Sequence, residues 1–99
     1  MLNINKTIEN GKAVFALVGR LDTTTAPQLE TELKSAMPGM EKLVMDFEKL
    51  EYISSAGLRV LLSAQKIMNK QGSMKIIHVN DVINEIFEVT GFSDILTIE

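Results

Sequence analysis

The sequence runs Tyr52-Ile53-Ser54-Ser55-Ala56-Gly57-Leu58-Arg59-Val60-Leu61-Leu62 through the point where an apolar strand pattern gives way to a helix. Serine is among the preferred residues at a helix N-cap, so Ser54 and Ser55 predict the boundary between the two elements. The first turn of a helix also offers unpaired backbone N–H groups and a partial positive charge, which together tolerate a phosphate. The junction therefore predicts either a plain helix cap or a serine that is modified as a switch.

A hairpin is predicted at the start of the chain. Leu2, Ile4 and Ile8 fall on alternate positions, which is the period of a strand with one face in water. Asn10-Gly11 suits a tight turn, and the stretch Ala13 to Val18 is apolar on both of its faces. We therefore expect the first strand at an edge of the sheet and the second strand, antiparallel to it, inside the sheet.

Two helices and one short strand are predicted next. Asp22 or one of the three threonines at 23–25 can cap a helix that ends at Pro38-Gly39, and its inward stripe comprises Ala26, Leu29, Leu33 and Met37. Residues Leu43 to Phe47 form a short apolar strand. The second helix opens at Ala56-Gly57-Leu58 and continues to Gly72, with most of its apolar residues in its first half.

The last part of the chain predicts a strand, a helix and a strand. Met74 to Val79 is apolar, and Asn80 or Asp81 can cap a third helix that ends at Gly91, whose inward face comprises Val82, Ile83, Ile86, Phe87 and Thr90. Leu96 to Glu99 is a final short strand. The element order predicts an α/β sandwich with three main helices and a mixed, mostly parallel sheet of about five strands, whose first hairpin is antiparallel.

Composition limits the function classes. The 99 residues are 45% hydrophobic and 23% charged, which is typical of one soluble domain spanning 1–99. A net charge of −3 with scattered lysines and arginines gives no basic footprint for nucleic acid or for an anionic membrane. The chain has no cysteine and no apolar run near the ~18 residues that span a membrane. We expect a cytoplasmic protein and a monomer, although the sequence leaves the oligomeric state open.

Two segments carry a resemblance to a known family. The segment from Gly19 to Pro27, which reads GRLDTTTAP, and the segment from Tyr52 to Leu62 together resemble the STAS domain family, specifically the bacterial anti-sigma factor antagonists. The likeness covers nearly the whole chain and implies a STAS-like sandwich. It also implies that the loop after the second strand and the start of the second helix dock onto an anti-sigma factor that is a serine kinase.

The resemblance assigns a phosphorylated serine. In the family this serine lies two residues before the helix glycine, which is Ser55 relative to Gly57 in this sequence. The family most often has Asp before that serine, whereas this chain has Ser54, which is the alternative acceptor. It also has Ala56 where Ser or Thr often follows. A PP2C-type phosphatase is implied as the enzyme that restores the unmodified form.

The same resemblance implies a partner-binding surface made of Asp22, Thr23, Thr24, Ser54, Ser55, Gly57, Leu58 and Arg59. A cation in the first helical turn interacts unfavourably with the helix dipole, so the position of Arg59 needs an explanation. Arg59 pairs with an acidic residue of the partner or with the phosphate, or it is an exposed arginine whose small cost in stability is tolerated. Asp22 likewise has two compatible roles, as a helix cap and as part of the partner-facing loop.

Other functions find less support in the sequence. The only histidine is His78, and no Gly-x-Ser-x-Gly pattern surrounds the serines, which argues against a serine hydrolase and against any catalytic residue. One histidine, no cysteine and scattered carboxylates give no metal-ligand spacing, and we expect no cofactor. Tyr52 and the methionines are expected to be packing or surface residues. A phosphocarrier using His78 and a ligand-sensing or transporter-associated module that binds nucleotide, lipid or protein without a serine switch stay open.

Overall fold

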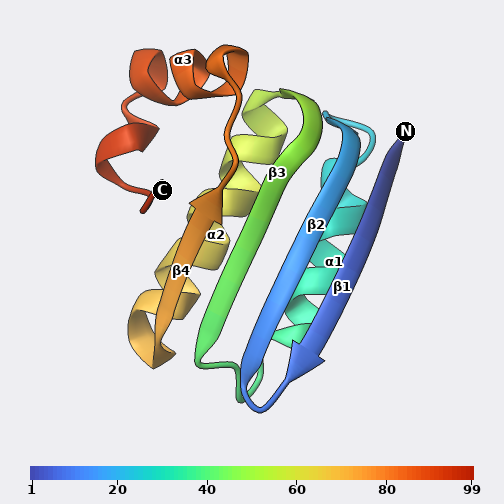
Figure 1. The fold of residues 1–99 in the computed structure, drawn as a ribbon, viewed down its shortest axis with the longest axis vertical. Helices are drawn as coiled ribbons and strands as arrows, with labels where there is room; N and C mark the ends of the chain where they lie inside the picture. Colours follow the sequence, from blue (N-terminus) through green and yellow to red (C-terminus); the bar gives the residue numbers. More distant parts are fainter.

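The computed structural model covers residues 1–99 and contains four strands and three α-helices (Figure 1). In chain order the elements are β1 (Leu2–Glu9), β2 (Lys12–Leu21), α1 (Ala26–Ala36), β3 (Lys42–Ile53), α2 (Ser55–Gln71), β4 (Ser73–Ile77), α3 (Asp81–Thr90) and the short 3-10 helix η1 (Phe92–Asp94). The sheet has the order β1-β2-β3-β4, with β1 antiparallel to β2 and the other neighbours parallel. The predicted mixed α/β class is therefore confirmed.

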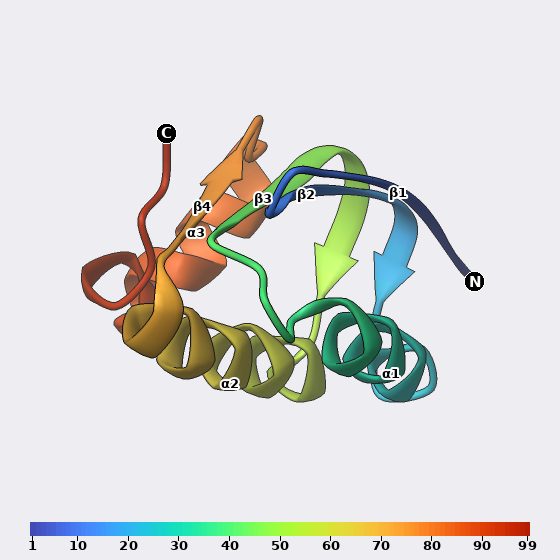
Figure 2. The ribbon, with the colours of Figure 1, turned by 90° about the horizontal axis from the view of Figure 1, so that it is seen from below.

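The helices cover the sheet unequally. Figure 2 shows α1 and α2 side by side beneath one face of the sheet, while α3 lies toward the β4 side. Phe87 of α3 packs against Phe47 of β3, with ring centroids 6.4 Å apart. The face of the sheet opposite α1 and α2 carries no helix (Figure 2). On β3 the half-buried Asp46 lies between the buried residues Met45 and Phe47, so its side chain points to this open face. None of the helices is long and apolar enough to cross a membrane.

The predicted hairpin is confirmed. Asn10 and Gly11 both have positive φ, 49° and 80°, which is the backbone of a two-residue turn matched to the twist of antiparallel strands. β1 forms the edge of the sheet, as expected. Its apolar face is not continuous, because Ile8 is 55% exposed and Lys6 pairs with Glu32 of α1. The C-terminal half of β1 therefore contacts α1 through the Lys6–Glu32 ion pair and not through apolar packing.

β3 is longer than the sequence pattern predicts. The predicted strand covers Leu43 to Phe47, whereas the structure extends it to Ile53. The exposed polar residues Glu48 and Lys49 interrupt the apolar pattern of the strand. They lie where the pairing of β2 with β3 shifts register, between Ala16 and Val18, and a second shift follows between Gly19 and Arg20. An extra residue at a register shift interrupts the alternation of apolar and polar positions that identifies a strand. The longer strand carries the chain directly to the serine junction.

The predicted fifth strand at Leu96 to Glu99 is not formed. The backbone N–H groups of Ile95 and Leu96 donate to the carbonyl of Phe92, so these residues belong to the turn that follows α3. Pairing with β4 is confined to one parallel bridge between Ile76 and Ile98. Local hydrogen bonds in the turn thus compete with the sheet, and the sheet has four strands instead of about five.

The core confirms most of the predicted inward positions. Twenty-five buried apolar residues form one cluster, which includes the packing methionines Met37, Met40, Met45, Met68 and Met74. Asn80 is the cap of α3, since its side chain accepts a hydrogen bond from the backbone N–H of Ile83 at 2.9 Å. Val82 and Thr90 were expected to face inward, but Val82 is 58% exposed and Thr90 is exposed as well. The buried residues of α3 are Ile83 and Phe87, a stripe too narrow to include Val82.

Candidate functional site

The two motifs of the sequence meet at one edge of the sheet. β2 and β3 are parallel neighbours whose last residues, Leu21 and Ile53, are paired. One residue further on, the backbone N–H of Ser54 donates to the carbonyl of Leu21 at 2.9 Å. The loop after β2 and the start of α2 are therefore adjacent, as expected for the carboxyl ends of neighbouring parallel strands (Figure 1).

The two adjacent serines have different environments. Ser54 is the N-cap of α2, and its Oγ accepts a hydrogen bond from the backbone N–H of Gly57 at 3.3 Å. Ser55 is the first residue of the helix and is exposed, and its hydroxyl makes no hydrogen bond within the protein. The structural role that the sequence offered to either serine thus belongs to Ser54, while Ser55 projects toward solvent.

Gly57 and Leu58 face the core and not the surface. A Cβ atom at Gly57 would lie 2.7 Å from Cγ of Leu21 and 2.9 Å from Cγ1 of Ile53, so only glycine allows α2 to start this close to β2 and β3. Leu58 is buried in the apolar cluster. Gly57 has no side chain and Leu58 is buried, so neither residue presents a side chain at the surface. The partner-binding set itself stays a prediction.

The loop after β2 is held together by Asp22. Its Oδ1 accepts hydrogen bonds from the hydroxyl of Thr24 at 2.7 Å, the backbone N–H of Thr24 at 3.0 Å and that of Thr25 at 3.1 Å. The pKa of Asp22 is lowered below its usual value, chiefly by the hydrogen bond from the Thr24 hydroxyl and further by the hydrogen bonds from the backbone N–H groups. The buried Thr25 is the N-cap residue of α1, whereas Thr23 and Thr24 are exposed.

Arg59 lies beside this loop. A shallow hollow of about 240 Å³ separates the starts of α1 and α2, and its lining residues are Thr23, Ala26, Pro27, Glu30, Ala56, Arg59 and Val60. Arg59 is exposed and takes part in none of the four ion pairs of the structure. The hollow brings Thr23 and Arg59 to one surface, so the exposed members of the predicted set are neighbours.

A pair of residues that the sequence analysis assigned to no site lies at the same edge. Arg20 and Tyr52 are partners in the pairing of β2 with β3, and the guanidinium carbon of Arg20 lies 4.6 Å from the centre of the Tyr52 ring. This distance is typical of a cation–π interaction. Their positions at the starts of the two motif segments are the only sequence signal of the pair, and the register that joins them becomes visible only in the folded sheet.

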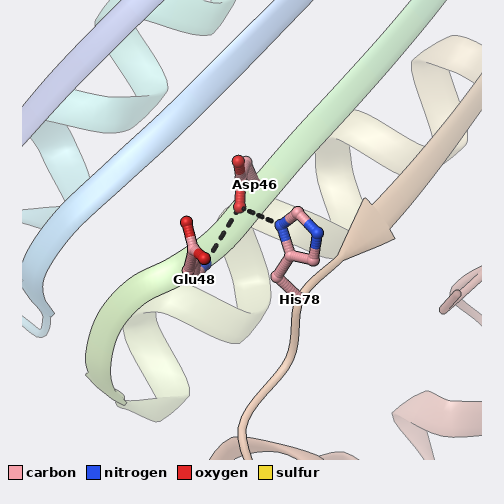
Figure 3. Close-up of side chains that lie close together, drawn as sticks. All are labelled: Asp46, Glu48 and His78. Atoms are coloured by element: carbon pink, nitrogen blue, oxygen red, sulfur yellow. Dashed lines mark hydrogen bonds and ion pairs between the residues drawn. The ribbon is translucent and has the colours of Figure 1, made fainter.

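His78 is exposed and lies beside the half-buried Asp46 and the exposed Glu48 (Figure 3). Its Nδ1 lies 2.9 Å from Oδ1 of Asp46, which also accepts the backbone N–H of Glu48 at 3.0 Å. The hydrogen bond to Asp46 raises the pKa of His78 above its usual value. Two of the carboxylates described as scattered therefore lie together with the histidine, and the spacing of Asp46 and Glu48 along one strand was the available signal.

Solved structures share this fold. An anti-sigma factor antagonist from Mycobacterium paratuberculosis superposes with a TM-score of 0.89 at 20% identity, over 99% of this chain and 85% of that chain. The anti-sigma factor antagonist SpoIIAA gives 0.78 in its unphosphorylated form, over 98% and 87%, and SpoIIAA of Bacillus gives 0.75 in its phosphorylated form, over 100% and 91%, both at 16% identity. A sulfate transporter family protein from Wolinella succinogenes gives 0.74 at 18% identity, over 90% and 74%. Such distant likenesses establish the fold alone.

Sequence relatives are more similar. BtrV of Bordetella bronchiseptica, described as a candidate anti-sigma factor antagonist, is 36% identical over 91 residues, which is 90% of this chain and 78% of that protein. The anti-sigma-B factor antagonist of Staphylococcus aureus is 30% identical over 97 residues, which is 96% of this chain and 90% of that protein. The family model described as the STAS domain matches residues 3–99. This chain belongs to the STAS domain family.

Proposed function

We propose that this protein is an anti-sigma factor antagonist whose binding is switched by phosphorylation of Ser55. The observation that carries the proposal is the exposed, unbonded hydroxyl of Ser55 at the start of α2, beside the loop that Asp22 organises. Both relatives described above are named for anti-sigma factor antagonism, the candidate from Bordetella and the anti-sigma-B factor antagonist from Staphylococcus. The partner is an anti-sigma factor serine kinase, and a PP2C-type phosphatase reverses the modification.

The proposed binding surface is narrower than the set of eight residues expected from the sequence. It comprises the exposed or half-buried residues Asp22, Thr23, Thr24, Ser55 and Arg59. Ser54, Gly57 and Leu58 contribute indirectly, because the cap hydrogen bond and the close packing of Gly57 hold the start of α2 against β2. A surface held by backbone hydrogen bonds and close packing needs little ordering when it binds, which favours affinity.

The physical basis of the switch is the change in charge at Ser55. A hydroxyl is small and its desolvation in an interface is readily compensated by one hydrogen bond, whereas a phosphoserine carries a charge of about −1.5 to −2 that is strongly hydrated. Burying that charge against the partner costs several kcal/mol unless a cation meets it. The phosphorylated protein therefore releases the anti-sigma factor, which is then free to bind its sigma factor.

Arg59 is the cation that shares a helix face with this charge, so a phosphate on Ser55 competes with the partner for it. It lies four residues after Ser55, a spacing that puts two helical side chains on one face, and it has no ion-pair partner within the protein. In the unmodified protein it pairs with an acidic residue of the partner, and in the modified protein it pairs with the phosphate. An Arg59→Ala variant that binds the partner as tightly as wild type in both phosphorylation states contradicts this role.

The test compares four baits: wild type, Ser55→Ala, Ser55→Asp and Ser54→Ala. Each is used to capture proteins from the cytosol of the source bacterium, and the captured proteins are identified by mass spectrometry. We expect wild type, Ser55→Ala and Ser54→Ala to retain an ATP-binding kinase-like protein that Ser55→Asp loses. When the captured kinase is incubated with ATP and the wild-type protein, we expect phosphate on Ser55. The Ser54→Ala protein is expected to be phosphorylated at Ser55 as well.

Two outcomes contradict the proposal. If all four baits retain the same proteins, Ser55 has no role in binding and is an exposed helix residue. If the phosphate is found on Ser54 or on His78, the acceptor assignment is wrong. Retention of a transporter subunit in place of a kinase would support the alternative of a transporter-associated module.

A further inference from the structure

Asp46, Glu48 and His78 bring two carboxylates and one imidazole together on the open face of the sheet (Figure 3). One potential ligand atom from each residue lies within 4.8 Å of those of the other two. Asp46 and Glu48 come from β3, whereas His78 comes from the turn after β4. The cluster is therefore built by two separate segments of the chain and includes its only histidine.

The charge of this cluster is not balanced by lysine or arginine. The ion pairs formed by lysines in this structure involve Glu30, Glu32 and Glu99, so neither Asp46 nor Glu48 has a lysine or arginine partner within 4 Å. The sole ion-pair partner of either carboxylate is the His78 ring, which contacts Asp46 and is charged only when it is protonated. Two carboxylates held this close repel one another, and a cation between them relieves the repulsion.

We propose that Asp46, Glu48 and His78 bind a divalent transition-metal ion of the zinc type. Imidazole nitrogen and carboxylate oxygen are both common zinc ligands, whereas magnesium and calcium select oxygen ligands. Ligand atoms at zinc distances in a tetrahedral site lie about 3.4 Å apart. The 2.9 Å between His78 Nδ1 and Asp46 Oδ1 therefore needs to open by roughly half an ångström for an ion to enter. The exposed side chain of Glu48 completes the three protein ligands.

A separate observation is the space beside the cluster. A hollow of about 160 Å³ is lined by two of the three cluster residues, Asp46 and Glu48, together with Asn5, Ala16, Leu17, Val18 and Lys49, while His78 lies outside its lining. Ala16 pairs directly with Asp46 across β2 and β3, and its small side chain leaves room over the sheet. The hollow gives a bound ion room for one or more water ligands, which three protein ligands leave unfilled. Lys49 at its rim is the cation that competes with the ion.

The test is isothermal titration of the untagged protein, freed of metal with a chelator, with Zn²⁺ and separately with Mg²⁺. We expect saturable binding of one Zn²⁺ per chain, and Mg²⁺ binding at least about tenfold weaker. The variants His78→Ala and Asp46→Asn are expected to weaken Zn²⁺ binding by more than about tenfold, because each removes one of only three ligands. Glu85→Gln, which changes an exposed carboxylate of α3, is the matched control and is expected to bind like wild type.

A second measurement does not depend on the variants folding. In NMR spectra of the wild-type protein, Zn²⁺ is expected to shift the His78 ring signals and the backbone amides near Asp46 and Glu48, and to leave those of α1 unchanged. The proposal is overturned if Zn²⁺ does not saturate, if folded His78→Ala binds it as tightly as wild type, or if the shifted signals belong to other residues. Equal affinity for Mg²⁺ overturns the assignment of a nitrogen ligand.

Discussion

At the scale of single residues, Ser54 and Ser55 are neighbours with separate roles. The Ser54 hydroxyl caps α2 through Gly57, whereas the Ser55 hydroxyl has no partner within the protein. Ser54→Ala is expected to lower the free energy of unfolding by about 0.5–2 kcal/mol, the usual cost of losing an N-cap side chain. Ser55→Ala is expected to change it little. Urea denaturation of both variants measures these changes. An equal loss of unfolding free energy in the two variants would contradict the assignment of the cap to Ser54 alone.

Asp22 makes a second prediction at this scale, which depends on pH. Hydrogen bonds from Thr24 and Thr25 lower the pKa of Asp22 in the folded protein below the usual 3.8. Protonation therefore favours the unfolded state, and the stabilisation by Asp22 is present above pH 3.8 and is lost as the pH falls through the lower folded value.

The measurement for Asp22 is the free energy of unfolding of wild type and Asp22→Ala across acid pH. The difference between the two proteins is expected to be constant near neutral pH and to shrink below pH 3.8. Asp94→Ala serves as the control, because the Asp94 side chain is exposed and makes no hydrogen bond. A difference for Asp22→Ala that does not shrink in acid would show that the carboxylate is not the stabilising form.

At the scale of elements, the start of α2 is set by a close approach. In most helix interiors, replacing glycine with alanine stabilises by about 0.8–1 kcal/mol, because alanine restricts the unfolded chain and has the higher helix propensity. At Gly57 the sign is expected to reverse, since a Cβ would come within 3 Å of Leu21 and Ile53. Gly57→Ala is predicted to destabilise by about 1–3 kcal/mol, the usual cost of overpacking. A more stable Gly57→Ala protein in thermal or urea unfolding would contradict this account.

The docking of α3 gives another prediction for a whole element. Phe87 is fully buried and contacts Phe47 of β3, whereas Val89 two residues later is 80% exposed. Phe87→Ala is expected to lower the free energy of unfolding by about 3–5 kcal/mol, through lost burial and the cavity left behind. Val89→Ala is the matched control, with an expected change below about 0.5 kcal/mol. Similar losses for both variants would mean that α3 is not anchored through Phe87.

At the scale of the whole molecule, the proposed switch lies outside the core. Ser55 is absent from the cluster of 25 buried residues, and the helix cap is supplied by Ser54. Ser55→Asp is therefore expected to keep the fold, with backbone amide shifts confined to residues 22–25 and 54–59 in a two-dimensional NMR spectrum. Shifts that spread to β4 or α3 would show that charge at Ser55 alters the fold and does not act on the surface alone.

Features set by neighbouring residues were predictable from the sequence. Asn10-Gly11 marks the hairpin, Ser54 stands at the start of α2 and Asn80 at the start of α3, because turns and helix caps are formed by side chains within a few residues. The adjacency of the two site loops was also predictable, because parallel strands bring their carboxyl ends together. The boundary of β3 at Ile53 was not, since the register shifts against β2 break the alternating pattern.

By itself, the sequence determined the order and type of the elements from β1 to α3, the hairpin and the serine junction, because these follow from the spacing of apolar residues and from local hydrogen bonds. Only the tertiary structure decided which of two adjacent serines is free, why residue 57 is glycine, and that Asp46 meets His78, 32 positions away. These outcomes depend on contacts between segments distant in the chain, whose register and close packing leave no periodic trace in the residues themselves.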